Sequence, residues 1–278
     1  MTTASRPGTR STVVSADGTR ISYQRIGSGP PVVVLPAAMN PGEAWRSVAE
    51  LLADEYTFLL VDRRHYPPSG PGPAPSSFAR EVQDVRAMIE VAGRPVHLLG
   101  HSYGGLLAME TALADPSDIR TLLLYEAPVN VAERDVAGCL EHYRALLAAG
   151  NPIGAIGCFL NELVLVPADA MAQMAASDVE FAPEPEDIAA LAEPLLHDIE
   201  SLTGLSPDPA RWAPIRLPVL LMAGANSWDP PLRGSTEALH RVFPHAEMAV
   251  WPGQTHFANM LAPEAVAATL REYLRTHG

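Results

Sequence analysis

Short apolar runs without polar alternation are the feature that most constrains the fold of this chain. They cover residues 31–35, 56–61, 96–99, 121–125, 219–222 and 246–251. Strands that are apolar on both faces are typical of parallel sheets covered by helices on each side. Segments with helical apolar spacing lie between the runs, at residues 44–54, 78–92, 105–114, 234–243 and 263–276. This alternation predicts an α/β fold with a doubly wound, mostly parallel β-sheet, opened by a hairpin that turns at Asp17-Gly18.

The stretch from residue 129 to 206 interrupts this alternation. It is rich in Ala and Leu at helical spacing and contains little that is typical of a strand. Prolines bound it on both sides, at Pro128 and at Pro207-Asp208-Pro209. We therefore expect an inserted helical cap at 129–206, above a core formed by residues 1–128 and 207–278.

Charge and composition restrict the partners of the protein. The 278 residues carry a formal net charge of −13, whereas nucleic acids and anionic membrane surfaces bind basic patches. No apolar run approaches the roughly 18 residues of a membrane span, and residues 1–20 lack the apolar core of a signal peptide. We expect a cytoplasmic protein that binds a small-molecule substrate, without nucleic acid, membrane or cofactor, and a homodimer stays open.

The chain has two cysteines, Cys139 and Cys158, and no Cys-x-x-Cys motif. A disulfide framework and a zinc site both need more extensive cysteine patterns. The sequence therefore predicts two buried free thiols and no metal.

The pentapeptide Gly100-His101-Ser102-Tyr103-Gly104 has the Gly-x-Ser-x-Gly pattern of a nucleophilic serine. The pattern arises by chance in many chains, but here it directly follows the apolar run 96–99 and opens a helical segment. So sharp a turn from strand to helix needs glycines beside the serine, because a side chain there would collide with the neighbouring strand or helix. We predict that Ser102 is a nucleophile at a helix N-terminus, where partial positive charge stabilises a developing anion.

A serine hydroxyl needs a base to remove its proton. His256 lies in Pro252-Gly253-Gln254-Thr255-His256-Phe257, between the last apolar run and the final helix, and its place after the serine fits this role. His101 and His97 are expected to be packed or hydrogen-bonded core residues. The remaining histidines are expected at the surface, with His65 as a candidate pocket residue.

These motifs resemble the α/β-hydrolase family over nearly the whole chain. Val61-Asp62-Arg63-Arg64 with Ser69-Gly70 is similar to the family's loop after the fourth strand, and Pro252 to His256 to its histidine loop. Residues 32–45 resemble the loop after the third strand, which usually carries a His-Gly pair where this chain has Pro36-Ala37-Ala38. Because backbone N–H groups stabilise the oxyanion, the resemblance implies Ala38 and Tyr103 as its donors.

The resemblance also implies a carboxylate that orients the histidine. The commonest family position, three residues beyond the glycine after the seventh strand, is Ser227 here. The candidates are Asp229, two residues farther on, and Glu126, at the end of the sixth strand, where certain haloalkane dehalogenases place their acid. Positional fit favours Glu126, with Asp229 as the alternative. A purely structural role for Glu126 is a salt bridge to Arg63 or Arg64.

A serine nucleophile predicts hydrolysis of a carboxylic ester, or of a lactone or thioester, through an acyl-enzyme. The apolar cap favours a small to mid-sized hydrophobic substrate. Five aromatic residues are candidates for the pocket wall: Trp45, Tyr66, Tyr103, Phe159 and Phe257. Three alternatives stay open: a carbon–carbon hydrolase or a cofactor-free oxygenase, both known on this fold, and a non-catalytic ligand-binding protein.

Overall fold

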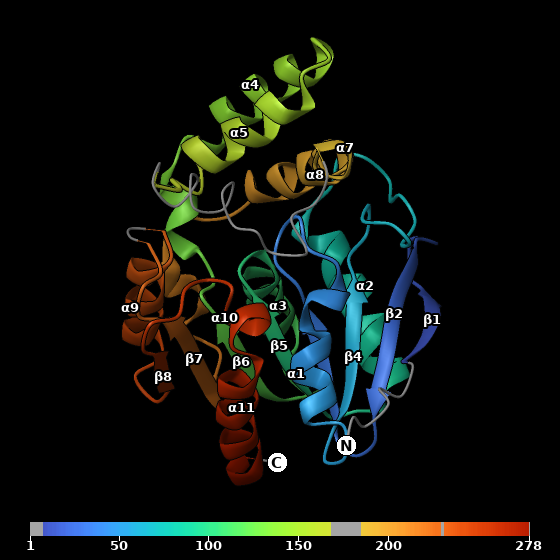
Figure 1. Cartoon of the computed structure of the whole chain (residues 1–278), viewed down its shortest axis with the longest axis vertical. Coiled ribbons are helices and arrows are strands. Elements are labelled where there is room, and N and C mark those ends of the chain that lie inside the picture. Colours follow the sequence, from blue (N-terminus) through green and yellow to red (C-terminus); the bar gives the residue numbers. More distant parts are fainter. Residues whose placement is uncertain (1–7, 168–184, 229–230, 278) are drawn as a thin grey trace.

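The computed structural model describes residues 8–167, 185–228 and 231–277 (Figure 1). The strands are β1 (Thr9–Val14), β2 (Arg20–Gly27), β3 (Pro31–Leu35), β4 (Thr57–Asp62), β5 (Val96–His101), β6 (Ile119–Tyr125), β7 (Val219–Gly224) and β8 (Glu247–Trp251). The α-helices are α1 (Arg46–Leu51), α2 (Phe78–Ala92), α3 (Tyr103–Ala114), α4 (Val136–Ala148), α5 (Pro152–Glu162), α7 (Pro185–Ala190), α8 (Ala192–Leu202), α9 (Arg233–Val242), α10 (Ala258–Leu261) and α11 (Pro263–His277). Short 3-10 helices are η1 (Gly42–Trp45), η2 (Val129–Glu133) and η3 (Pro209–Trp212).

The eight strands form one sheet in the order β1-β2-β4-β3-β5-β6-β7-β8. β1 and β2 pair antiparallel, as do β2 and β4, and every other neighbouring pair is parallel. The predicted mostly parallel sheet and its opening hairpin are therefore confirmed. Because β3 and β5 to β8 run the same way, the loops after these strands meet at one edge of the sheet.

Helices cover both faces of the sheet, as the apolar runs predicted. Alternate residues of β3 lie in two different hydrophobic clusters. Val33 packs with α2 and α3 on one face of the sheet, whereas Val32 packs with α1 and α11 on the other. The strands β3 to β7 are almost fully buried. No helix in the described ranges combines the length and apolar character needed to cross a membrane.

The last strand, β8, corrects one expectation. Its apolar run predicted burial on both faces, yet Met248 and Val250 are 43% and 49% exposed. β8 is the last strand at this edge of the sheet and, among the described residues, pairs with β7 alone. The sequence alone does not distinguish this edge strand from a central one.

The helices between β6 and β7 lie beyond one end of the sheet, where α4, α5, α7 and α8 stack above the core (Figure 1). We call these four the cap helices; the division of the chain into a core domain and a cap domain stays a prediction. A buried ion pair connects α8 to the core, because the Arg63 guanidinium donates to both carboxylate oxygens of Asp198, at 2.6 and 2.8 Å. Charge-assisted bidentate pairs of this kind fix orientation as well as distance.

Glu81 on α2 extends this connection. Its carboxylate accepts hydrogen bonds from Arg63 at 3.3 Å, from the Tyr103 hydroxyl and from the Ser201 hydroxyl on α8 at 3.2 Å. Burial, with the neighbouring Asp198 carboxylate, raises the pKa of Glu81 to about 7 and outweighs the opposing effect of Arg63.

The turn between β5 and α3 brings backbone segments into close contact. A Cβ atom at Gly104 would overlap the carbonyl oxygen of Leu35 on β3, and one at Gly100 would overlap the carbonyl of Gly104. The expected steric reason for these two glycines is thus confirmed. By contrast, a Cβ at Gly157 on α5 would meet no atom within 4 Å.

We expect Gly104→Ala to destabilise the protein strongly, by roughly 3 kcal/mol or more, because the clash is with backbone that cannot rotate away. The matched control, Gly157→Ala, should stabilise it by up to about 1 kcal/mol, since alanine favours a helix over glycine. Urea unfolding of both variants measures the difference. Equal stabilities would contradict the close packing of this turn.

The raised pKa of Glu81 predicts a pH dependence of stability. The folded state binds the Glu81 proton more tightly than the unfolded state, so this stabilisation is complete below about pH 4.5 and is lost as pH rises through about 7. Relative to Glu81→Gln, which does not titrate, the wild type should lose about 3 kcal/mol across this window. Urea unfolding from pH 4 to 8 measures it, with Glu90→Gln on the exposed side of α2 as control. A pH-independent difference would contradict the prediction.

Candidate active site

Ser102 occupies the tight turn between β5 and α3. Its backbone has φ 53° and ψ −120°, a conformation that costs a residue with a side chain roughly 1–3 kcal/mol. The Ser102 N–H donates to the Tyr125 carbonyl at 2.8 Å, which connects the turn to β6. The turn therefore holds the serine in a strained conformation at the N-terminus of α3, as the pentapeptide predicted.

Glu126 follows β6 directly and also has a positive φ, of 45°. Its buried carboxylate accepts two hydrogen bonds, from the Gly224 N–H to Oε1 at 2.8 Å and from His256 Nδ1 to Oε2 at 2.6 Å. A buried carboxylate is costly unless it has such partners. When this carboxylate is ionised it can only accept, so the contact selects the tautomer of a neutral His256 that carries its proton on Nδ1.

Two aromatic residues, His101 and Tyr125, hold the loop that carries His256 through hydrogen bonds. His101 Nε2 lies 3.1 Å from the His256 carbonyl oxygen. Burial lowers the pKa of His101 well below its usual value, so the ring is neutral and Nε2 carries the hydrogen that is donated. The Tyr125 hydroxyl donates to the Thr255 carbonyl at 2.5 Å and accepts from the Ala258 N–H at 3.1 Å.

The expectation that His101 is a buried, hydrogen-bonded residue is confirmed, but its contact with His256 was missed, as was Tyr125 altogether. The rings of His101 and Tyr125 stack with centroids 4.5 Å apart. Each is the residue just before a candidate site residue, Ser102 or Glu126. An aromatic residue at the last position of a strand was the only signal in the sequence.

The sequence left two alternatives to Glu126 as the orienting carboxylate, a structural salt bridge of Glu126 and the use of Asp229. Arg63 and Arg64 do not pair with it, because their guanidinium groups bind other carboxylates, so the expected structural salt bridge is wrong. Asp229 lies outside the described residues. Ser227, at the commonest family position, is buried, and its hydroxyl has no hydrogen-bond partner among the described residues.

The two predicted oxyanion donors, Ala38 and Tyr103, line the same cavity as Ser102. Tyr103 is the first residue of α3, where an N–H has no intrahelical acceptor. Within the described part of the chain, the Ala38 N–H donates no hydrogen bond. Both amides are thus available to an oxygen atom in the cavity.

The loop that carries Ala38 is held by residues that follow β4. The Met39 N–H donates to the Tyr66 hydroxyl at 3.1 Å, and this hydroxyl donates to Asp198 at 2.5 Å. Arg63 donates to the Ala37 carbonyl at 3.5 Å. The same ion pair that connects α8 to the core therefore also positions the loop, in place of a His-Gly pair.

The cavity beside Ser102 is small and mostly apolar. Its volume is about 40 Å³, far below the roughly 150 Å³ that accommodates benzene in a protein core. Cap helices and core both contribute to its wall, which consists of Ala38, Ser102, Tyr103, Leu106, Pro128, Val131, Phe159, Leu163, Val164, Leu202, Pro231 and Leu232.

Two of the five predicted aromatic residues, Tyr103 and Phe159, line this cavity. Tyr66 instead supports the Ala38 loop, and Trp45 is fully buried against the rings of His101 and Tyr125. Phe257 contacts the rings of His256 and Trp228. Tyr66 and Trp45 are therefore core residues, which the sequence had left as an equal alternative, and Phe257 lies beside the candidate base without lining the cavity.

His65 does not line the cavity either. Its ring stacks on that of His197 on α8, with centroids 3.7 Å apart. Burial lowers the pKa of His65 to about 4. A neutral His65 therefore packs between core and cap.

Potential metal ligands gather at a different place. Cys139 and Cys158 are buried free thiols, as expected, and they lie with Glu162 on the cap helices. No contact connects this group to Glu126 or His256 among the described residues. The contacts connect the imidazole of His256 to the carboxylate of Glu126, and no hydrogen bond joins the Ser102 hydroxyl to His256 among the described residues. A hydroxyl, an imidazole, a carboxylate and backbone amides are the groups of acyl-transfer chemistry.

Comparison with known proteins adds independent findings. The chain is 32% identical to an alpha/beta hydrolase from Sphaerobacter thermophilus, with a TM-score of 0.81 over 95% of this chain and 100% of that one. A thermophilic esterase from Thermogutta terrifontis shares the fold, with a TM-score of 0.73 and 19% identity over 97% and 100% of the two chains.

Among curated proteins, a protein that bears the name carbamate hydrolase RutD, from Azorhizobium caulinodans, is 31% identical over 132 residues, 47% of this chain and 49% of that one. A pimeloyl–acyl-carrier-protein methyl ester esterase from Aeromonas hydrophila is 34% identical over 108 residues, 37% and 40% of the two chains. These matches span half or less of the curated relatives.

The model of the "Alpha/beta hydrolase family" matches residues 32–269. This match covers most of the chain, which therefore belongs to the α/β-hydrolase family.

Proposed function

We propose that this enzyme is a serine hydrolase that cleaves a carboxylic ester, or a related lactone or thioester, of a small-molecule substrate with an apolar acyl group. Ser102 is the nucleophile, His256 the general base and Glu126 the carboxylate that orients it. The observation that carries the proposal is the 2.6 Å hydrogen bond between His256 Nδ1 and Glu126 Oε2. It fixes the tautomer in which Nε2 can take a proton.

In the proposed mechanism, His256 Nε2 removes the proton of the Ser102 hydroxyl as Oγ attacks the carbonyl carbon of the substrate. The carbonyl oxygen becomes an oxyanion that accepts hydrogen bonds from the N–H groups of Ala38 and Tyr103. The intermediate collapses, and the leaving alcohol or thiol takes the proton from His256. A water molecule then gives a proton to His256, attacks the acyl-enzyme and releases the acid.

The cavity favours a small acyl group. Its volume of about 40 Å³ and its apolar wall leave little space beside Ser102 in this conformation. Relatives that are named as esterases support the reaction class, although related chains also include a fluoroacetate dehalogenase from Burkholderia. The nucleophile distinguishes ester hydrolysis from dehalogenation. This chain has Ser102 in the nucleophile turn, and water hydrolyses an ester of serine at its acyl carbon.

An active-site phosphonate tests the nucleophile. We expect one adduct, located at Ser102 by peptide mass spectrometry, and loss of p-nitrophenyl ester hydrolysis in proportion to labelling. Ser102→Ala should abolish both. A small, reactive probe that leaves Ser102 unmodified, with activity intact, would overturn the hydrolase proposal.

The carboxylate is tested by comparing Glu126→Gln with Asp229→Asn. In Glu126→Gln the new amide N–H would face Nδ1 and favour the tautomer with its proton on Nε2, which cannot act as a base. We expect kcat to fall by about three to four orders of magnitude in this variant and to change little in Asp229→Asn. Circular dichroism checks that both variants fold. Comparable losses, or the reverse order, would reject Glu126.

A further inference from the structure

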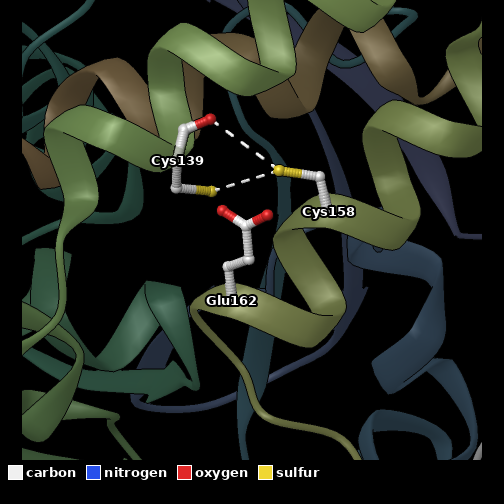
Figure 2. A group of neighbouring side chains, drawn as sticks. All are labelled: Cys139, Cys158 and Glu162. Atoms are coloured by element: carbon white, nitrogen blue, oxygen red, sulfur yellow. Dashed lines mark hydrogen bonds between the residues drawn. The ribbon is translucent and has the colours of Figure 1, made fainter.

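The two cysteines and an acidic side chain converge between two cap helices. Cys139 lies on α4, and Cys158 and Glu162 lie one turn apart on α5 (Figure 2). One ligand atom from each of the three lies within 4.8 Å of the others. Figure 2 shows the carboxylate of Glu162 directed toward the two sulfur atoms.

A fourth donor reaches the same group. His142, one turn after Cys139 on α4, places Nδ1 3.5 Å from Cys158 Sγ and 2.8 Å from Glu162 Oε1. The two thiols are almost fully buried, whereas His142 and Glu162 are partly exposed, with side-chain exposures of 54% and 41%. The group therefore has buried sulfur ligands and an open side through which an ion can enter.

Two of the three distances match those around a tetrahedral zinc ion, whereas the 2.8 Å between His142 Nδ1 and Glu162 Oε1 is that of a hydrogen bond, and these two atoms must separate to about 3.4 Å when an ion binds. Bonds of about 2.3 Å to sulfur and 2.0–2.1 Å to nitrogen place two sulfurs about 3.8 Å apart, and a sulfur and a nitrogen about 3.5 Å apart. The observed Cys139 Sγ to Cys158 Sγ distance is 3.6 Å, and Cys158 Sγ to His142 Nδ1 is 3.5 Å. A disulfide would need the two sulfurs at about 2.05 Å, so the separation fits a bridging ion better than a bond.

We propose that Cys139, Cys158, Glu162 and His142 form a binding site for a borderline-soft divalent cation of the zinc class, between α4 and α5. Two thiolates, an imidazole and a carboxylate are a ligand set that such ions prefer over magnesium or calcium. The sequence contains the corresponding spacings, Cys139-x-x-His142 and Cys158-x-x-x-Glu162, each on one face of a helix. The prediction of no metal rested on the absence of a Cys-x-x-Cys motif and of a metal-like histidine spacing around the two cysteines, and it gave no weight to Cys139-x-x-His142.

The site lies close to the roof of the cavity. Phe159 follows Cys158 in α5, and Leu163 follows Glu162; both line the cavity beside Ser102. An ion that joins α4 to α5 would restrict movement of this roof, independently of whether the enzyme acts on esters.

Cobalt(II) is the spectroscopic probe for this site. The full chain, reduced and treated with a chelator that is then removed, is titrated with CoCl₂. We expect one equivalent to bind, with a near-ultraviolet thiolate-to-cobalt charge-transfer band and intense visible bands of tetrahedral Co²⁺, and ZnCl₂ to displace it. A titration that gives no charge-transfer band overturns the proposal.

Variants assign the ligands. Cys139→Ser and Cys158→Ser should each remove most of the charge-transfer band, and Glu162→Gln and His142→Gln should weaken binding by roughly tenfold or more. The last two alter partly exposed side chains, so they keep the test valid if a serine variant fails to fold. The matched control is His277→Gln. It removes a histidine–glutamate contact, between His277 and Glu247, in which no cysteine takes part. Unchanged binding in the four variants would overturn the site.

Zinc should also protect both thiols from maleimide and raise the thermal midpoint of the wild type but not of Cys158→Ser. If the protein binds neither ion and instead forms an intramolecular Cys139–Cys158 disulfide in air, the pair is a thiol couple and the metal proposal is wrong. Because cobalt spectra do not require turnover, these results are independent of the phosphonate test at Ser102.

Discussion

The close crossing of β5, α3 and β3 is the constraint on which the candidate site depends. Gly100 and Gly104 carry no side chain, and none would fit at either position. The backbone can therefore turn from strand to helix within one residue. The residue in the turn, Ser102, adopts a positive φ that the surrounding contacts enforce. Strain at this point is maintained by packing elsewhere, since β5 is buried on both faces and α3 is buried along most of its length. The proposed nucleophile is thereby held in place by the packing of the core together with the backbone hydrogen bond from Ser102 to Tyr125.

The carboxylate of Glu126 adds a second constraint, because a buried charge must be paired. One oxygen is satisfied by the Gly224 amide at the end of β7 and the other by His256 on the loop after β8. Glu126 and these two partners follow or end three successive strands of the sheet, so the parallel order β6-β7-β8 is what brings them together. The stacked rings of His101 and Tyr125 support the histidine loop from the core side.

The ion pair of Arg63 with Asp198 joins two parts of the molecule that contribute to the cavity. It holds α8 against the core and, through Tyr66 and the Ala37 carbonyl, fixes the loop that carries Ala38. The loop that holds Ala38 in place of the family's His-Gly pair is thus positioned by contacts of residues after β4.

The sequence by itself determined the strands, the helices and the candidate nucleophile and base, because these depend on local periodicity and on a turn that only glycines permit. It could not separate the edge strand β8 from a central strand, since burial depends on neighbours that are remote in the chain. Nor could it show which carboxylate meets His256, or that Tyr66 and Trp45 turn away from the cavity. Those outcomes depend on contacts between residues that are remote in the chain, such as Glu126 and His256, which lie 130 positions apart. Only the tertiary structure decided them: Glu126 and His256 meet because the ends of parallel strands converge at one edge of the sheet.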